Sequence, residues 1–134
     1  MATYIFEKEF AVRDYELDFQ GIVNNSVYLN YLEHTRHEFV KQAGINLPEL
    51  HREGLDPVLV RADIQYKHSL VSGDRFVSRL YVRKEGIRFV FYQQIYRISD
   101  EKDIVKAKIE IAVLRHGMPE RHSIFDDLFQ PYLA

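Results

Sequence analysis

The chain has no cysteine among its 134 residues. Disulfide bonds, zinc held by thiolates and a cysteine nucleophile are therefore excluded. Because small secreted domains often depend on disulfides, this absence favours a cytoplasmic protein. Residues 1–9 reach charged side chains before any apolar stretch is long enough for a signal peptide, so we expect no secretory leader.

Long apolar runs and an excess of one charge are also missing. No segment approaches the roughly 20 consecutive apolar residues that a membrane span needs, so we expect no membrane span. The net charge of -2 and the pI near 6.3 lack the basic excess typical of proteins that bind nucleic-acid phosphates. The length and a hydrophobic fraction of 46% fit one globular domain over residues 1–134.

An amphipathic helix is predicted after residue 26. The apolar positions of this stretch keep the spacing of one helix face. They are Tyr28, Tyr31, Leu32, Thr35, Phe39 and Val40. Asn25 or Ser26 can cap the start of the helix, and Gly44 can end it.

Strands are predicted in most of the remaining chain. Residues 5–15 mix apolar and charged side chains, and strand-like patterns run from Pro57 almost to the C-terminus. The clearest alternation covers residues 105–113, where the odd-numbered residues are apolar and all but one of the others are charged. One long helix with antiparallel strands and short turns indicates an α+β fold in which a sheet curls around the helix. Oligomerisation would cover the open edge of such a sheet.

The segment from Asp18 to Asn25 offers the most chemistry. It places a carboxylate, Asp18, and a glycine, Gly21, just before the helix N-terminus, where unpaired backbone N–H groups carry partial positive charge. Such a terminus can polarise a carbonyl oxygen while a carboxylate attacks the carbonyl carbon or activates a water. The same residue types are ordinary in a loop and a helix cap, so the pattern alone leaves both interpretations open.

This segment is part of a longer pattern. Asp18-x-x-Gly21-x-Val23-x-Asn25 is followed by Tyr28, Tyr31 and Glu33, then by Pro57-Val58, Ile64-x-Tyr66 and Gly73-Asp74. In these positions the chain resembles the 4-hydroxybenzoyl-CoA thioesterase-like hotdog family, which includes short acyl-CoA thioesterases associated with the Tol–Pal system. The resemblance implies a five- to six-stranded antiparallel sheet wrapped around one central helix of about residues 26–43. It also implies a homodimer or homotetramer with sites at the subunit interface.

The resemblance gives roles to individual residues. Asp18 matches the catalytic carboxylate, which acts as a nucleophile or as a general base toward water. Asn25 matches the position whose backbone N–H holds the thioester oxygen, while Gly21 and Val23 match residues of the substrate site. Many relatives have a histidine where this chain has Ile22, so the subgroup stays open.

Other charged residues carry weaker patterns. His34 and His37 share one helix face, but no further ligand cluster accompanies them in the sequence, so we expect no metal site. Glu33 stands at a recurrent family position and is expected to orient the helix or the loop by hydrogen bonds. Arg88, next to the turn at residues 85–86, is a candidate contact for coenzyme A phosphates, with a solvated hairpin end as the alternative.

The function that the resemblance implies is hydrolysis of an acyl-CoA to a free acid and CoA, without a metal or redox cofactor. Hydrolysis of acyl groups on an acyl carrier protein would change the partner and keep the chemistry. Dehydration of a hydroxyacyl thioester is disfavoured, because hotdog dehydratases generally pair a histidine with the carboxylate and none lies near Asp18 in sequence. A non-catalytic acyl-CoA-binding module is the alternative from a different class.

Overall fold

The computed structural model of the chain describes residues 3–134. Its main layer is a six-stranded antiparallel sheet in the order β1-β3-β4-β5-β2, with β6 added beside β5. The strands are β1 (Phe6–Ala11), β2 (Leu55–Tyr66), β3 (Arg75–Glu85), β4 (Arg88–Arg97), β5 (Asp103–Arg115) and β6 (Met118–Pro119). The helices are α1 (Asn25–Gln42), α2 (Leu47–Arg52) and α3 (Ile124–Phe129), with 3₁₀ turns η1 (Asp14–Glu16) and η2 (Gln130–Tyr132).

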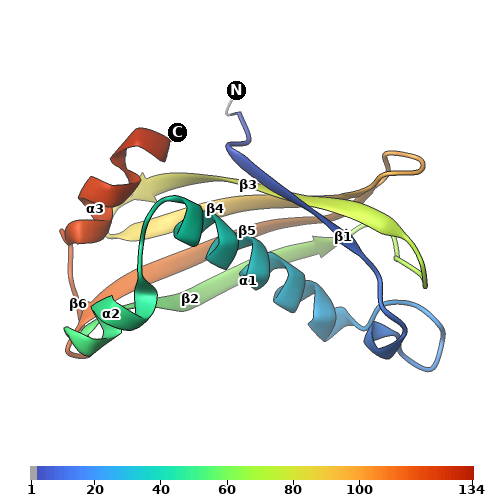
Figure 1. The fold of residues 1–134 in the computed structure, drawn as a ribbon, viewed down its shortest axis with the longest axis horizontal. Coiled ribbons are helices and arrows are strands. Elements are labelled where there is room, and N and C mark those ends of the chain that lie inside the picture. The colour runs from blue at the N-terminus through green and yellow to red at the C-terminus, as the bar shows by residue number, and fades with distance from the viewer. Residues whose placement is uncertain (1–2) are drawn as a thin grey trace.

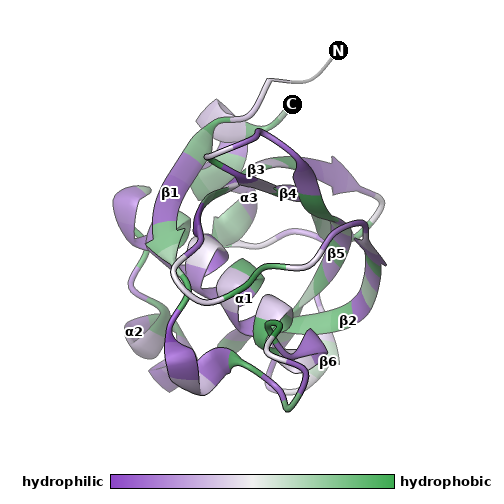
Figure 2. Cartoon of the chain, turned by 90° about the vertical axis from the view of Figure 1, so that its right-hand side faces the viewer, coloured by the Kyte–Doolittle hydropathy of each residue, from purple (hydrophilic) through white to green (hydrophobic). Residues whose placement is uncertain are grey.

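The sheet curls around α1, and the short helices α2 and α3 lie at the same end of the sheet (Figure 1). Seen from the other end, the strands from β1 to β2 curve around α1 (Figure 2). All six positions of the predicted helix stripe are buried against the sheet. The predicted α+β hotdog architecture is thereby confirmed. Within residues 3–134, no helix is long and apolar enough to cross a membrane.

The start of α1 differs by one residue from the sequence-based expectation. Asn24 is the cap, because its extended backbone lets its side-chain oxygen accept the backbone N–H of Ser26 at 3.0 Å. The prediction of Asn25 or Ser26 as the cap was wrong, and Asn25 is instead the first helical residue. The helix ends at Gln42, and Gly44 follows its end as predicted, with a left-handed φ of 82° and its N–H donated to the carbonyl of Lys41.

The first two strands also differ from their predicted bounds. β1 ends at Ala11 rather than at residue 15, because the chain turns into η1, where Glu16 Oε1 accepts the N–H of Arg13 at 2.8 Å. β2 begins at Leu55, so Pro57 lies inside the strand. A proline is tolerated there because β2 is at the edge of the sheet and needs no donor on its open side.

Several large apolar side chains of β2 remain exposed on this open edge. They are Val58, Leu59, Val60 and Tyr66. A shift of the register with β5 between Leu59 and Arg61 makes Val60 an extra residue in the strand. A strand with one unpaired edge and exposed apolar residues is an unusual surface for a monomeric protein.

Candidate active site

A short hairpin leads from η1 into α1. Asn24 donates its backbone N–H to the carbonyl of Glu16 at 3.0 Å, and Asp18 donates to the carbonyl of Ile22 at 2.8 Å. Gly21, with φ 80°, closes the tip and donates its N–H to the carbonyl of Asp18 at 3.0 Å. A left-handed residue at the third position is typical of three-residue hairpin loops, which explains a glycine at this point.

The backbone of this hairpin orients the Asp18 side chain. Oδ1 accepts the N–H of Gln20 at 2.8 Å and that of Ile22 at 3.4 Å. Oδ2 has no hydrogen-bond partner in the part of the chain that the structure describes. The carboxylate is therefore fixed through one oxygen, and the other oxygen stays available for a further partner.

The N-terminus of α1 follows the hairpin directly and supplies a backbone donor. Ser26 and Val27 donate their N–H groups to Asn24, through the side chain and the carbonyl respectively. The N–H of Asn25 has no acceptor among residues 3–134. A donor at the positive end of an 18-residue helix can stabilise an oxyanion, so the predicted role of Asn25 is geometrically possible.

A small pocket of about 110 Å³ opens beside this donor. It is lined by Val23, Asn25, Tyr28 and residues 66–69. Tyr66, at the end of β2, donates its hydroxyl to the carbonyl of Asn25 at 3.4 Å. The hydroxyl of Tyr28 accepts the N–H of Leu70 at 3.1 Å, and burial raises the pKa of this tyrosine. The structure thus places Val23 and Asn25 in one pocket and puts Asp18 on the adjoining hairpin.

Glu16 is a site residue that sequence reasoning missed. Its buried carboxylate accepts the hydroxyl of Tyr31 at 2.8 Å and so ties the hairpin to α1. Burial and this hydrogen bond raise the pKa of Tyr31. Glu33 does not share this role, because it is exposed and faces His37 at 3.6 Å. Of the predicted alternatives, the helix or the loop, Glu33 contacts only α1 within residues 3–134. The one sequence signal for Glu16 was its position two residues before Asp18.

Removing the hydroxyl of Tyr31 tests this anchor. Tyr31→Phe leaves the buried Glu16 carboxylate with one partner fewer, so we expect the free energy of unfolding to fall by about 1–3 kcal/mol. Urea unfolding followed by circular dichroism measures the loss. Tyr15→Phe is the matched control, since Tyr15 is 78% exposed and should change stability little. Equal stabilities of the two variants would show that Glu16 does not depend on Tyr31.

Arg88 lies far from Asp18 within one chain. It pairs with Ala112 close to the start of β2, whereas the hairpin and Asn25 adjoin the end of that strand. Its guanidinium donates to Glu110 Oε1 at 3.0 Å. Of the two helix histidines, His34 faces Glu38 and His37 faces Glu33, each at 3.6 Å.

Comparison with known proteins identifies the family. A family model described as the thioesterase-like superfamily matches residues 12–126. The matched part includes the Asp18 hairpin, α1 and every strand from β2 to β6. The chain belongs to this superfamily. The thioesterase-like superfamily is one of thioester hydrolases, and its hotdog fold is the architecture described above.

Two relatives show how similar this chain is to individual thioesterases. It is 43% identical over 105 residues to acyl-acyl carrier protein thioesterase ATL2, chloroplastic, of Arabidopsis thaliana, which covers 76% of this chain and 55% of the plant protein. The chain therefore spans about half the length of that relative. It is 26% identical over 133 residues to the candidate acyl-CoA thioesterase YneP of Bacillus subtilis, covering 92% of this chain and 96% of YneP.

One solved structure illustrates the shared fold. Slr0204, a 1,4-dihydroxy-2-naphthoyl-CoA thioesterase from Synechocystis, superposes with a TM-score of 0.85 at 16% identity. The superposition covers 96% of this chain and 94% of that protein. The similarity supports the fold of this superfamily member.

Proposed function

We propose that the chain hydrolyses a small-molecule acyl-CoA to a free acid and coenzyme A, with Asp18 as the catalytic carboxylate. The observation that carries the proposal is the hairpin, which fixes Asp18 through Oδ1 and leads directly into the helix terminus with the unpaired N–H of Asn25. Membership in a superfamily of thioester hydrolases supports the same reaction. Gly21 and Val23 form the loop and the pocket wall on this side.

The reaction needs only groups that the chain holds. The thioester oxygen accepts the N–H of Asn25, and the helix terminus stabilises the negative charge that develops on that oxygen. Asp18 either takes a proton from a water that attacks the carbonyl carbon or attacks that carbon itself, with water then cleaving the resulting anhydride. In both routes the C–S bond breaks, the hydroxyl of water ends in the acid, and the thiolate of CoA receives a proton.

We further propose that two chains pair through β2. Support comes from the open edge of this strand and from the exposed apolar side chains Val58, Leu59 and Val60. An antiparallel pair of β2 strands would continue the sheet across a twofold axis. It would also bring the end of one β2, with its Asn25, close to the start of the other. Pairing of such dimers into a homotetramer stays a prediction, as does the contact of Arg88 with coenzyme A phosphates.

Two candidate substrates differ in the carrier of the acyl group, which is either CoA or an acyl carrier protein. The match to YneP over nearly the full length of both proteins favours an acyl-CoA. The higher identity to ATL2 favours an acyl carrier protein as the second candidate. The word chloroplastic in that name concerns the plant protein, and a cytoplasmic location for this chain stays a prediction.

A direct assay separates these substrates. The purified protein is given identical acyl groups on CoA and on acyl carrier protein, and release of free thiol is followed with a chromogenic disulfide. We expect a higher kcat/KM for the CoA thioesters. The opposite order would support the carrier-protein candidate, and no thiol release from either would refute both hydrolase proposals.

A further inference from the structure

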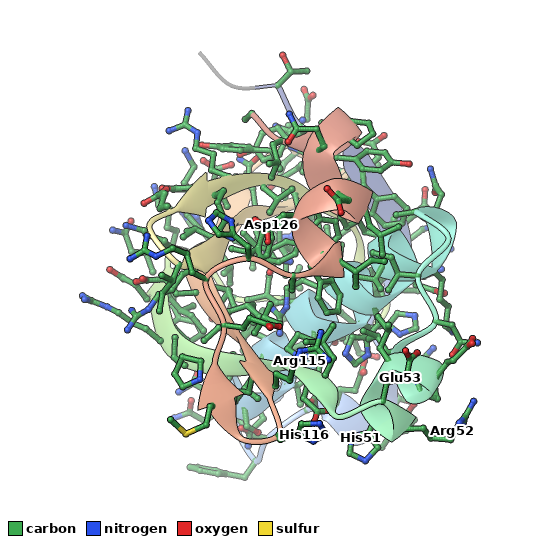
Figure 3. The ribbon with its side chains drawn as sticks, turned by 90° about the vertical axis from the view of Figure 1, so that its left-hand side faces the viewer. His51, Arg52, Glu53, Arg115, His116 and Asp126 are labelled. Atoms are coloured by element: carbon green, nitrogen blue, oxygen red, sulfur yellow. The ribbon has the colours of Figure 1, made fainter. Side chains whose placement is uncertain are left out.

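A second pocket of about 140 Å³ lies away from Asp18, between the C-terminal half of α1 and the end of the sheet where α2 and α3 gather (Figure 1). Figure 3 views that end, with Arg115 at the end of β5 and His116 just after it close to the C-terminus of α2. The pocket walls are mainly apolar and aromatic, including Val40, Leu47, Leu59, Phe89 and Phe129. A cavity of about 150 Å³ holds a benzene-sized ligand, so this pocket can take a group of about six carbons.

Arg36 is the exception in this apolar lining. It is 9% exposed, and its Nη1 donates to Gln93 Oε1 at 2.9 Å. Gln93 is itself held by a hydrogen bond from its Nε2 to the carbonyl of Leu32 at 3.1 Å. Burial lowers the pKa of Arg36 to about 10, so the guanidinium stays charged at neutral pH.

The charge of Arg36 lacks a direct anionic partner. No ion pair involves Arg36 in the described part of the chain, and Glu33 on the pocket rim faces His37 instead. Glu33 acts on Arg36 only by long-range attraction, which partly offsets the effect of burial on the pKa of the guanidinium. A buried charge without a partner is costly, whereas a carboxylate would offer two acceptors to the guanidinium fork.

We infer that this pocket takes the distal end of an acyl chain that carries a carboxylate, and that Arg36 holds this carboxylate. The substrates would then be thioesters of dicarboxylic acids. This inference rests on the proposed thioesterase function and on its dimer. The apolar walls would surround the methylene groups, and the guanidinium would select for the terminal charge.

The pocket and the thioester site would meet across the dimer. Pro57 and Leu59, near the start of β2, line the pocket, whereas Asn25 contacts Tyr66 at the end of that strand. In one chain, roughly 23–30 Å of strand separate Pro57 and Leu59 from Tyr66. An antiparallel β2 pair brings the start of one strand to the end of the other. Asp18 of one subunit would therefore work with Arg36 of the partner subunit.

Matched substrates test the selectivity. Adipoyl-CoA and suberoyl-CoA are compared with hexanoyl-CoA and octanoyl-CoA, which have the same chain lengths and end in a methyl group. We expect the wild type to show a kcat/KM about 10- to 100-fold higher for the dicarboxylic substrates. A factor of this size is what hydrogen bonds to a charged group contribute to binding in a buried site. Arg36→Met should lose this preference, so that its kcat/KM for adipoyl-CoA no longer exceeds its kcat/KM for hexanoyl-CoA. Arg36→Lys should retain part of the preference, because it keeps the charge without the fork.

Arg79→Met is the matched control. Arg79 donates to Gln94 Oε1 at 2.8 Å, as Arg36 does to Gln93, but it lies on the opposite face of the sheet. It should keep the full preference. A wild type without preference for dicarboxylic substrates would overturn the inference. If that wild type still hydrolyses thioesters and needs Asp18 to do so, the proposed function stands. The same preference in Arg36→Met, shown to be folded by circular dichroism, would also overturn it.

If the wild type hydrolyses no thioester, the proposed function fails and the pocket is still tested by binding. Calorimetry then compares the Kd values of adipoyl-CoA and hexanoyl-CoA for the wild type and Arg36→Met. Tighter binding of adipoyl-CoA only when Arg36 is present supports the pocket. Equal Kd values for the two ligands refute it.

Mixing two variants that each hydrolyse adipoyl-CoA poorly tests the shared site. When Asp18→Asn and Arg36→Met chains are unfolded, mixed and refolded, each heterodimer has one doubly altered site and one intact site if the residues act across the interface. We expect about a quarter of wild-type activity on adipoyl-CoA from a random mixture. No gain over the separate variants would show that both residues serve the same subunit, or that the pocket takes no part.

Discussion

Asp18→Asn should lower kcat by about 10²- to 10⁴-fold and leave the fold unchanged. Asparagine keeps the side-chain oxygen that accepts the N–H groups of Gln20 and Ile22, so the hairpin should persist. It removes the charge with which the carboxylate attacks carbon or takes a proton from water. Steady-state thiol release gives kcat, and circular dichroism with urea unfolding checks the fold.

The matched control is Asp14→Asn. Asp14 lies four residues earlier and accepts the hydroxyl of Ser72 at 2.6 Å, so its charge is close to the site without belonging to it. We expect kcat within about twofold of wild type for this variant, as for most surface substitutions. Unchanged turnover in Asp18→Asn would contradict the catalytic role and favour a binding module. Lost turnover of Asp18→Asn with retained affinity for CoA would support the catalytic role of Asp18.

Val60→Asp should convert the protein to monomers and reduce kcat/KM by about 100-fold, the loss that a displaced catalytic group can cause. Val60 is 44% exposed at the middle of the open strand β2. Near the twofold axis of the proposed dimer, the aspartates introduced in the two subunits would lie side by side. Like charges on adjacent strands repel each other. Size-exclusion chromatography with light scattering measures the mass, and thiol release measures the activity.

Ile98→Asp provides the control for this edge. Ile98 is 39% exposed and follows β4, away from the open strand. It should keep the wild-type mass and kcat/KM. A Val60→Asp monomer with full activity would show that the site is complete within one chain, and a Val60→Asp dimer would show that chains pair elsewhere.

The helix and the sheet were predictable because their patterns are local. Burial of the odd-numbered residues 105–113 in β5 follows directly from the alternation in the sequence, as the buried stripe of α1 follows from its spacing. The errors lie at element ends, where a side-chain hydrogen bond decides. Asn24 rather than Asn25 caps α1 for this reason, and the bond from Arg13 to Glu16 ends the extended chain early.

The arrangement of the site was less predictable because its contacts join distant residues. Tyr31 reaches Glu16 across 15 positions, and Tyr66 reaches Asn25 across 41. Arg36 reads in the sequence as a polar residue of the helix, and only its contact with Gln93, 57 positions later, reveals it as buried. Family resemblance singled out Asp18. It did not indicate the hydrogen bonds that hold the Asp18 hairpin in place, because these join residues that are distant in the sequence.

The hydrogen bonds that hold the Asp18 hairpin have a consequence for the entropy of binding. The loop is tied to α1 through Glu16 and Tyr31, and to the segment after β2 through the N–H of Val23 and the carbonyl of Leu70 at 2.9 Å. A carboxylate ordered before the substrate arrives loses little conformational freedom on binding. Differences in affinity between acyl groups should therefore arise where the acyl chain ends, and the loop should contribute equally to all of them.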